Sequence, residues 1–301
     1  MGCFTGEGAR FMNVSVVIPV YNRGEAVGDT LDSVLRQTWM PLEILVVDDG
    51  STDGSADWIE ARYGEVVRVI RQANGGVARA RNRGWREAQG EWIAFLDHDD
   101  QFRADKLEIL KPFIEGESDV VVSRWREVRD EKVVRISPVI GPRNVFGWLF
   151  GWHNPIVSMS VPVVRRSVLE KVGGFNARAA PADDWDLWLR LALVASFSFC
   201  DDPTTDYHLH EGQQRLDEAR MFRVVRRTLA KYPLQLARRP LLLWWLVWSG
   251  AFRVSIPAYE AFARGEWGAL RLALRAHPLA LLSPQWVATL MKRIVGRVFQ
   301  T

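Results

Sequence analysis

Residues 14–23 have the sequence VSVVIPVYNR, in which an apolar, β-branched run ends in polar residues. The same pattern recurs at residues 43–48 (EILVVD) and 91–97 (EWIAFLD). Such runs are typical of strands that a parallel sheet buries on both faces. A further strand is expected at residues 66–70, and helices are expected at residues 25–37, 53–63 and 77–88. This alternation indicates an α/β fold with right-handed crossovers, in which helices flank a mostly parallel sheet.

Polar residues follow each of the three strands at its carboxyl end. They occupy residues 21–23 (YNR), 48–51 (DDGS) and 97–100 (DHDD). In sheets of this kind, ligands bind outside the carboxyl ends of the strands. We therefore expect the three clusters to converge on one ligand site.

The third cluster contains two carboxylates, Asp97 and Asp99, on either side of His98. Hard cations such as Mg²⁺ and Mn²⁺ bind a few carboxylates together with phosphate oxygens of a substrate. An acidic turn or the first turn of a helix would also place two carboxylates here without any ligand. The neighbouring clusters favour the metal site, and they give His98 no role.

Asp49 and Tyr21 each have two interpretations. Asp49 could accept hydrogen bonds from a base or a ribose, or it could belong to a turn in which Ser51 or Asp53 caps the next helix. Tyr21 could offer its ring to a nucleobase or pack in a partly buried position.

Residues 74–82 (NGGVARARN) join a glycine turn to a predicted helix. Exposed N–H groups and arginines at this position could bind a diphosphate. The segment lacks Gly-Lys-Ser/Thr and Gly-x-Gly-x-x-Gly, so it is neither a triphosphate loop nor a dinucleotide fingerprint. Arg79, Arg81 and Arg83 cannot all face one side of a helix, so some of them must be solvated.

Acidic residues begin an amphipathic helix expected at residues 183–194. Asp183 and Asp184 could favour the first turn through the helix macrodipole, or one could be a general base that takes a proton from a hydroxyl. His208 and His210 follow a strand-like stretch. They are either structural histidines or candidates for a third metal ligand or a phosphate contact.

The pattern changes beyond residue 118. Strands are expected at residues 120–122 and 157–164, and helices at residues 166–172 and 216–231 with two or three more after residue 240. We expect a main domain at residues 1–215 and a basic, Trp-rich helical tail at residues 216–301. The longest apolar run of the tail, residues 241–248, is far shorter than the ~20 residues that a membrane-spanning helix needs.

The net charge of +3 conceals an asymmetry along the chain. Residues 220–301 contain 14 Lys and Arg and 2 Glu, or +12, which leaves −9 for the other 219 residues. Basic residues mixed with tryptophans favour a membrane surface as the partner of this segment. Nucleic acid is not expected as a partner, because no zinc-finger spacing or RNA-binding aromatic signature is present.

The chain has two cysteines, Cys3 and Cys200, which form neither a disulfide framework nor metal-ligand spacing. A basic stretch followed by a long apolar run is absent from the N-terminus, so no signal peptide is expected. We therefore expect a cytoplasmic protein that binds the cytoplasmic face of a membrane peripherally.

Six segments together resemble the inverting family-two glycosyltransferases with the GT-A fold. They are VSVVIPVYNR (14–23), EILVVDDGSTDGS (43–55), NGGVARARNRG (74–84), EWIAFLDHDD (91–100), VGGFN (172–176) and DDWDLWLRL (183–191). Each is weak to moderate by itself, but all six occur in the order that the family has.

The resemblance implies roles on the side of a nucleotide-sugar donor. Tyr21, with Pro19 beside it, would stack on the nucleobase, and Asp49 would hydrogen-bond the base. Asp97 would contact the ribose, and Arg81 would lie near the diphosphate.

The resemblance also implies a metal site and a catalytic base. Asp99 would hold Mn²⁺ or Mg²⁺, with His210 as a loosely matched further ligand. Asp184 matches the base, beside Asp183 where the family usually has Glu, and residues 173–175 would shape the acceptor side.

The implied activity is transfer of a sugar, with inversion, from a UDP-sugar to a hydroxyl of a glycan or lipid-linked acceptor. Synthesis of a cell-surface polysaccharide or glycolipid would use such an enzyme. The alternative is a non-catalytic adaptor with the same fold that acts through its tail at a membrane. The carboxylates at Asp49, Asp97, Asp99 and Asp184 argue against this alternative. A nucleotidyltransferase is disfavoured as well, because no Gly-rich triphosphate loop is present.

Overall fold

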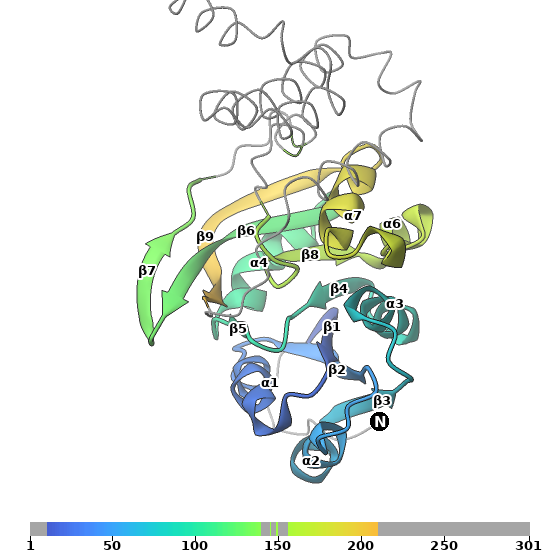
Figure 1. The fold of residues 1–301 in the computed structure, drawn as a ribbon. Helices are drawn as coiled ribbons and strands as arrows, with labels where there is room; N and C mark the ends of the chain where they lie inside the picture. The colour runs from blue at the N-terminus through green and yellow to red at the C-terminus, as the bar shows by residue number, and fades with distance from the viewer. Residues whose placement is uncertain (1–10, 140–144, 146–148, 150–155, 210–301) are drawn as a thin grey trace, which may run out of the picture. The chain divides into compact units, whose positions relative to one another are not determined.

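The computed structural model of the chain describes residues 11–139, 145, 149 and 156–209 (Figure 1). The strands are β1 (Phe11–Val20), β2 (Met40–Asp48), β3 (Val67–Arg71), β4 (Trp92–Phe95), β5 (Gln101–Phe102), β6 (Val120–Arg129), β7 (Lys132–Ile136), β8 (Pro162–Arg165) and β9 (Phe197–His208). The helices are η1 (Gly24–Val27), α1 (Gly28–Leu35), α2 (Ser55–Tyr63), α3 (Val77–Glu87), α4 (Lys106–Ile114), α6 (Arg166–Val172), η3 (Ala177–Ala179) and α7 (Asp183–Leu191).

One sheet has the strand order β3-β2-β1-β4-β8-β6-β9-β5, with β7 paired to β6. β1 pairs in parallel with β2 and β4, and β2 pairs in parallel with β3, as the sequence predicts. The second half differs, because β8 is antiparallel to both β4 and β6 while β9 is parallel to β6. The predicted parallel unit is therefore the first half of a mixed sheet.

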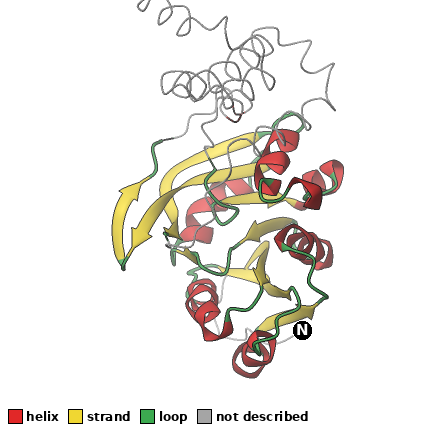
Figure 2. Ribbon diagram, in the orientation of Figure 1, coloured by secondary structure: helices red, strands yellow, loops and turns green. Residues whose placement is uncertain are grey.

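Helices cover both faces of the sheet (Figure 2). On one face, Val16 and Ile18 of β1 belong to the apolar core that also contains Leu31 of α1 and Ile59 of α2. On the other face, a Cβ on Gly84 would lie 2.2 Å from the Val17 side chain, so only glycine allows α3 to pack this close to β1.

Several boundaries differ from those expected. The helix expected at residues 25–37 is split into η1 and α1, and the strand expected at residues 157–164 is the short β8. The strand expected at residues 120–122 continues to Arg129, and its second half buries Trp125 and Val128 while charged residues there are partly or fully exposed. This half of the strand is therefore only half buried, in contrast to the fully buried residues 120–123.

The expected tail at residues 216–301 and its boundary with the main domain lie outside the described residues, so both stay predictions. In the part of the chain that the structure describes, no helix is long and apolar enough to cross a membrane.

Candidate active site

The loops that follow β1 and β2 are joined by hydrogen bonds. The hydroxyl of Ser55 accepts from the backbone N–H groups of Arg23 and Gly24, at 3.0 and 2.7 Å. The side-chain oxygen of Asn22 accepts from the backbone N–H of Thr52 at 2.8 Å. The backbone N–H of Asn22 also donates to the Ser51 hydroxyl at 3.0 Å, so the first two strand-end clusters meet, as expected.

The turn before α2 is capped differently from the expectation. Gly54, with φ of +84°, is the N-cap residue, so neither Ser51 nor Asp53 occupies that position. Asp53 instead accepts from the backbone N–H of Ser55 at 3.0 Å, which closes an Asx-turn one residue earlier. The left-handed conformation explains why a glycine replaces a side-chain cap.

Tyr21 lies at the end of β1 with 46% of its surface exposed. Pro19, two residues earlier, is buried and pairs with Val47 of β2. About half of the Tyr21 surface is therefore available to a flat partner, and both interpretations of this residue stay predictions.

The Asp49 carboxylate is 3% exposed and holds the glycine turn that precedes α3. It accepts from Gln72 Nε2 at 2.6 Å and from the backbone N–H groups of Gly75 and Gly76 at 2.9 and 2.7 Å. Asp49 thus connects the end of β2 to the start of α3. A carboxylate has about four acceptor positions, so this structural task leaves room for a further donor.

The backbone of the triplet at residues 97–99 is held by a side chain of α1. The Thr30 hydroxyl contacts the backbone oxygens of His98 and Asp100, each at 2.9 Å. The side chain of Asp99 is 36% exposed, and its Oδ2 lies 3.8 Å from His98 Nε2. Burial lowers the pKa of His98, Asp99 opposes this effect, and the nearby Arg23 charge adds to it. β1 and β4 are neighbouring parallel strands, with Val17 opposite Phe95, so the first and third clusters follow adjacent strand ends.

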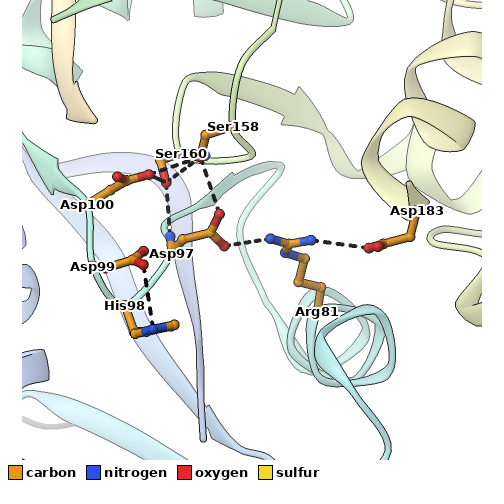
Figure 3. Close-up of polar contacts among 8 residues, drawn as sticks. All are labelled: Arg81, Asp97, His98, Asp99, Asp100, Ser158, Ser160 and Asp183. Carbon is orange, nitrogen blue, oxygen red and sulfur yellow. Dashed lines mark hydrogen bonds and ion pairs between the residues drawn. The ribbon is translucent and has the colours of Figure 1, made fainter. Parts of the chain in front are cut away.

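Asp97 is held by groups from α3 and from the segment before β8 (Figure 3). Arg81 Nη2 donates to Asp97 Oδ1 at 2.6 Å, and the Ser158 hydroxyl donates to Oδ2 at 3.2 Å. The backbone N–H of Asp97 donates to the Ser160 hydroxyl at 3.0 Å. Burial alone would raise the pKa of Asp97, but the Arg81 guanidinium and these hydrogen bonds hold it below its usual range.

Asp100 is almost fully buried beneath the triplet. Its Oδ2 lies 3.0 Å from the Ser158 hydroxyl and 2.5 Å from the Ser160 hydroxyl, and its Oδ1 accepts from the backbone N–H of His208 at 3.2 Å. Burial and the charges of Asp97 and Asp99 raise the pKa of Asp100 well above its usual value. Sequence reasoning missed the two serines, although two hydroxyls one residue apart in an apolar run (IVSMSVPVV, 156–164) are a detectable signal.

Asp183 and Asp184 begin α7, as predicted. Asp183 is buried, and its Oδ2 lies 3.2 Å from Arg81 Nη1. Burial and the adjacent Asp183 charge raise the pKa of Asp184 to about 7, although Arg81 opposes this effect. A carboxyl group that titrates near neutral pH is suited to general-base chemistry.

The Gly-Gly-Phe turn at residues 173–175 packs against α3. Asn82 Nδ2 donates to the Phe175 carbonyl oxygen, and the Phe175 N–H donates to Asn82 Oδ1, both at 2.8 Å. A Cβ on Gly174, where φ is +71°, would lie 2.4 Å from Asn82 Oδ1. The buried Phe175 ring lies under Arg81, with 5.4 Å between the guanidinium carbon and the ring centroid.

The other sequence-derived candidates are placed as follows. Arg81 is buried while Arg79 and Arg83 are exposed, which confirms that the three do not share one environment. His210 lies outside the described residues, so its expected role as a ligand stays a prediction. Within those residues, no three His, Cys, Asp or Glu side chains are grouped so as to hold a metal ion by themselves.

Comparison with known proteins gives concordant matches. The sequence profile described as Glycosyl transferase family 2 matches residues 15–173. An uncharacterized glycosyltransferase of Rickettsia felis is 28% identical over 215 residues, which cover 67% of this chain and 35% of that protein. The amylovoran biosynthesis glycosyltransferase AmsB of Erwinia amylovora is 30% identical over 213 residues, which cover 66% of this chain and 70% of AmsB.

A solved structure shares the fold. The crystal structure of S. aureus TarS 1-349 in complex with UDP-GlcNAc matches with a TM-score of 0.60 at 24% identity, over 72% of this chain and 65% of that chain.

Matches to the Rickettsia relatives span between 35% and 65% of the length of those proteins. On the profile match and the similarity to AmsB, the chain belongs to glycosyl transferase family 2.

Proposed function

We propose that the chain transfers a sugar from a UDP-sugar to an acceptor hydroxyl with inversion at the anomeric carbon. The observation that carries this proposal is the environment of Asp184. The pKa of its carboxyl group is raised to about 7. Arg81 forms ion pairs both with Asp183, which precedes Asp184, and with Asp97, which would lie on the donor side. Transfer of a sugar to a hydroxyl uses a general base, and Asp184 would supply it close to Asp97, which would contact the nucleotide.

The donor would bind across the three strand ends. The exposed Tyr21 ring would stack on the base above the buried Pro19, and Asp49 would hydrogen-bond the base with its remaining acceptor positions. Asp97, held ionised by Arg81, would accept hydrogen bonds from the ribose hydroxyls. UDP is proposed as the nucleotide because the fold is shared with TarS, whose crystal structure contains UDP-GlcNAc.

The residues present fit a divalent cation that is shared with the donor. Asp99 projects from a turn that Thr30 fixes, and over a third of its side chain is exposed. Mg²⁺ and Mn²⁺ are commonly bound by one or two carboxylates together with substrate phosphate oxygens, so a closed protein cage is not required. Asp99 would therefore hold the ion, which when bound neutralises charge on the diphosphate.

Asp184 would take the proton of the acceptor hydroxyl. The acceptor oxygen forms a bond to the anomeric carbon as the bond from that carbon to the diphosphate oxygen breaks. The diphosphate leaves on the opposite face, which inverts the configuration in a single displacement. Burial, together with the charge of Asp183, keeps the pKa of Asp184 high enough for the carboxylate to act as a base near neutral pH.

The acceptor is proposed to be a glycan or a lipid-linked glycan. AmsB is described as an amylovoran biosynthesis glycosyltransferase, and it is 30% identical to this chain. The basic segment at residues 220–301 would bring the enzyme to an anionic membrane surface where such acceptors are presented. Binding of the full chain to anionic and neutral vesicles measures this part of the proposal separately.

A thermal-shift screen tests the donor and the metal together. The melting temperature is measured with UDP, GDP and dTDP and with their common sugar conjugates, with and without Mn²⁺. A ligand that binds only the folded protein raises the melting temperature, so the screen identifies the preferred base. We expect UDP and UDP-sugars with Mn²⁺ to give the largest increase.

Release of UDP with an acceptor glycan then separates the enzyme from the adaptor alternative. A protein that binds UDP-sugars but releases no UDP with any glycan acceptor would have the adaptor function. Hydrolysis or transfer of the sugar supports the enzyme.

A further inference from the structure

Arg81 connects two parts of the site, the Asp97 carboxylate after β4 and the Asp183 carboxylate at the start of α7. Its Nη2 donates to Asp97 at 2.6 Å, while Nη1 lies 3.2 Å from Asp183, 102 residues away in sequence (Figure 3). Its side chain is 8% exposed, and the guanidinium lies over the Phe175 ring. α3, the turn after β4 and the start of α7 thus converge on one side chain.

This environment differs from that expected of a residue that binds a diphosphate. Both terminal nitrogens of Arg81 have carboxylate partners, whereas Nε is buried without a hydrogen-bond partner among the described residues. An arginine clamp for phosphate presents its planar fork to the ligand. Here the fork is engaged by Asp97 and Asp183.

α3 also holds the segment that leads to α7. Asn82, next to Arg81, makes two hydrogen bonds to the backbone of Phe175. The guanidinium and the Asn82 amide therefore fix the same stretch of chain from adjacent positions of one helix. Movement of α3 would change the position of Asp183 relative to Asp97.

We propose that Arg81 is a positioning residue that fixes the start of α7, and with it Asp184, against the donor-side carboxylate Asp97, and that it does not bind the diphosphate. The inference rests on the proposed function, because it assigns Asp184 as the base and Asp97 as the donor contact. It replaces the donor-binding role that the sequence implies for Arg81.

The charges around Asp184 give this role a measurable consequence. The charges of Asp183 on the same helix and of Asp97 after β4 raise the pKa of Asp184, and the charge of Arg81 on α3 lowers it. Asp186 on the same helix is paired with Arg190 at 2.8 Å. Arg81 is the cation that opposes the effects of burial and of Asp183, so its loss raises the pKa of Asp184 further.

The test compares Arg81→Lys, Arg81→Gln and the double variant Arg81→Gln/Asp183→Asn with the wild type. Lysine keeps the charge but cannot bridge two carboxylates with a planar fork. The double variant removes a buried charge together with one of its partners, which protects the fold if Arg81→Gln alone unfolds. Arg83→Gln is the matched control, since Arg83 is an exposed arginine on the same helix.

Three quantities are measured for each variant: the Kd for UDP with Mn²⁺ by calorimetry, kcat with KM for the donor, and the pH dependence of kcat/KM. For Arg81→Lys we expect kcat to fall by about 10- to 100-fold, because a small displacement of the base is costly, while the Kd for UDP stays close to the wild-type value. In Arg81→Gln the acid limb of the pH profile should move to higher pH, and in the double variant it should return toward lower pH. Arg83→Gln should leave all three quantities unchanged.

Two results would overturn the inference. One is a loss of UDP affinity as large as the loss of kcat/KM with an unmoved pH profile, which identifies Arg81 as a diphosphate ligand. The other is wild-type behaviour in every Arg81 variant.

A wild-type protein that transfers no sugar instead contradicts the proposed function. The link between Arg81 and Asp183 is then measured without activity, by a double-mutant cycle on the melting temperature. Additive effects of the two substitutions would contradict the link.

Discussion

Asp97 and Asp184 are both partly or largely buried aspartates near Arg81, yet their environments act in opposite directions. Asp97 lies after β4, where the Arg81 guanidinium and the Ser158 hydroxyl hold its pKa below the usual range despite burial. Asp184 lies at the start of α7, where burial and the charge of Asp183 raise its pKa to about 7. Arg81 bonds directly to Asp97 but reaches α7 through Asp183.

The difference shows how one residue type can serve two chemical roles a short distance apart. A carboxylate that stays ionised is suited to accept hydrogen bonds or to hold cations, whereas one that titrates near neutral pH is suited to take up a proton. The partner of each side chain decides between these roles, and the partners come from distant parts of the sequence.

The largest expected effect is on turnover, and it comes from substitution of Asp184 at the start of α7. Asp184→Asn should lower turnover by about 10²–10⁴-fold, the usual range for the loss of a general base, and leave UDP binding nearly unchanged. Steady-state kinetics and calorimetry with UDP and Mn²⁺ measure the two quantities. Full turnover by the Asn variant would remove the distinction between the two aspartates.

The next largest effect is on the affinity for UDP, and it comes from substitution of Asp99 in the triplet after β4. Asp99→Asn should reduce the affinity for UDP in Mn²⁺ to the level that the wild type shows in EDTA, because the residue proposed to hold the ion is lost. Calorimetric titrations with Mn²⁺ and with EDTA make the comparison, and Arg83→Gln serves as a control for general charge effects. An unchanged titration in Mn²⁺ would contradict the proposed site of the metal.

A smaller effect is expected in the pH dependence. Because Asp184 must be ionised to accept a proton, kcat/KM should fall below pH 7, by about tenfold per pH unit. Asp183→Asn removes the charge that raises the pKa of Asp184, so its acid limb should move to lower pH. The measurement is kcat/KM as a function of pH for the wild type and for Asp183→Asn. Acid limbs that coincide would show that Asp183 does not control the pKa of Asp184.

The smallest effect is on stability. The pKa of Asp184 is raised from 3.8 to about 7 in the folded state, so the native protein loses stability relative to the unfolded chain as pH rises through this window. Asp184→Asn lacks this loss, so its melting temperature should exceed that of the wild type by a few degrees at pH 8 and by little at pH 4. Thermal melts at both pH values measure the difference. An equal difference at the two values would contradict the raised pKa.

The sequence predicted well what depends on local pattern. Apolar runs identified β1, β2 and β4, and the polar residues after β1 and β2 meet through contacts such as Asn22 with Ser51. Helical geometry also showed that the arginines of α3 must face different surroundings, and only Arg81 is buried.

The rest depends on pairings between distant segments. β8 inserts antiparallel between β4 and β6, and this brings Ser158 and Ser160 to Asp97 and Asp100, about 60 residues earlier in the chain. The ion pair between Arg81 and Asp183 joins residues 102 positions apart. Neither arrangement follows from periodicity or from turn composition, because both depend on strand order in the sheet.

The position of β9 has a consequence for synthesis of the chain. β9 lies between β6 and β5 in the sheet, and the backbone N–H of His208 reaches Asp100 beneath the triplet. During synthesis, β6 emerges from the ribosome before β9, so the edge of β6 that pairs with β9 stays unpaired until β9 has emerged. Unpaired strand edges of this kind promote aggregation. Chaperone demand should be greatest in that interval, and a fragment that ends at residue 173, where the family profile ends, would retain the exposed edge permanently.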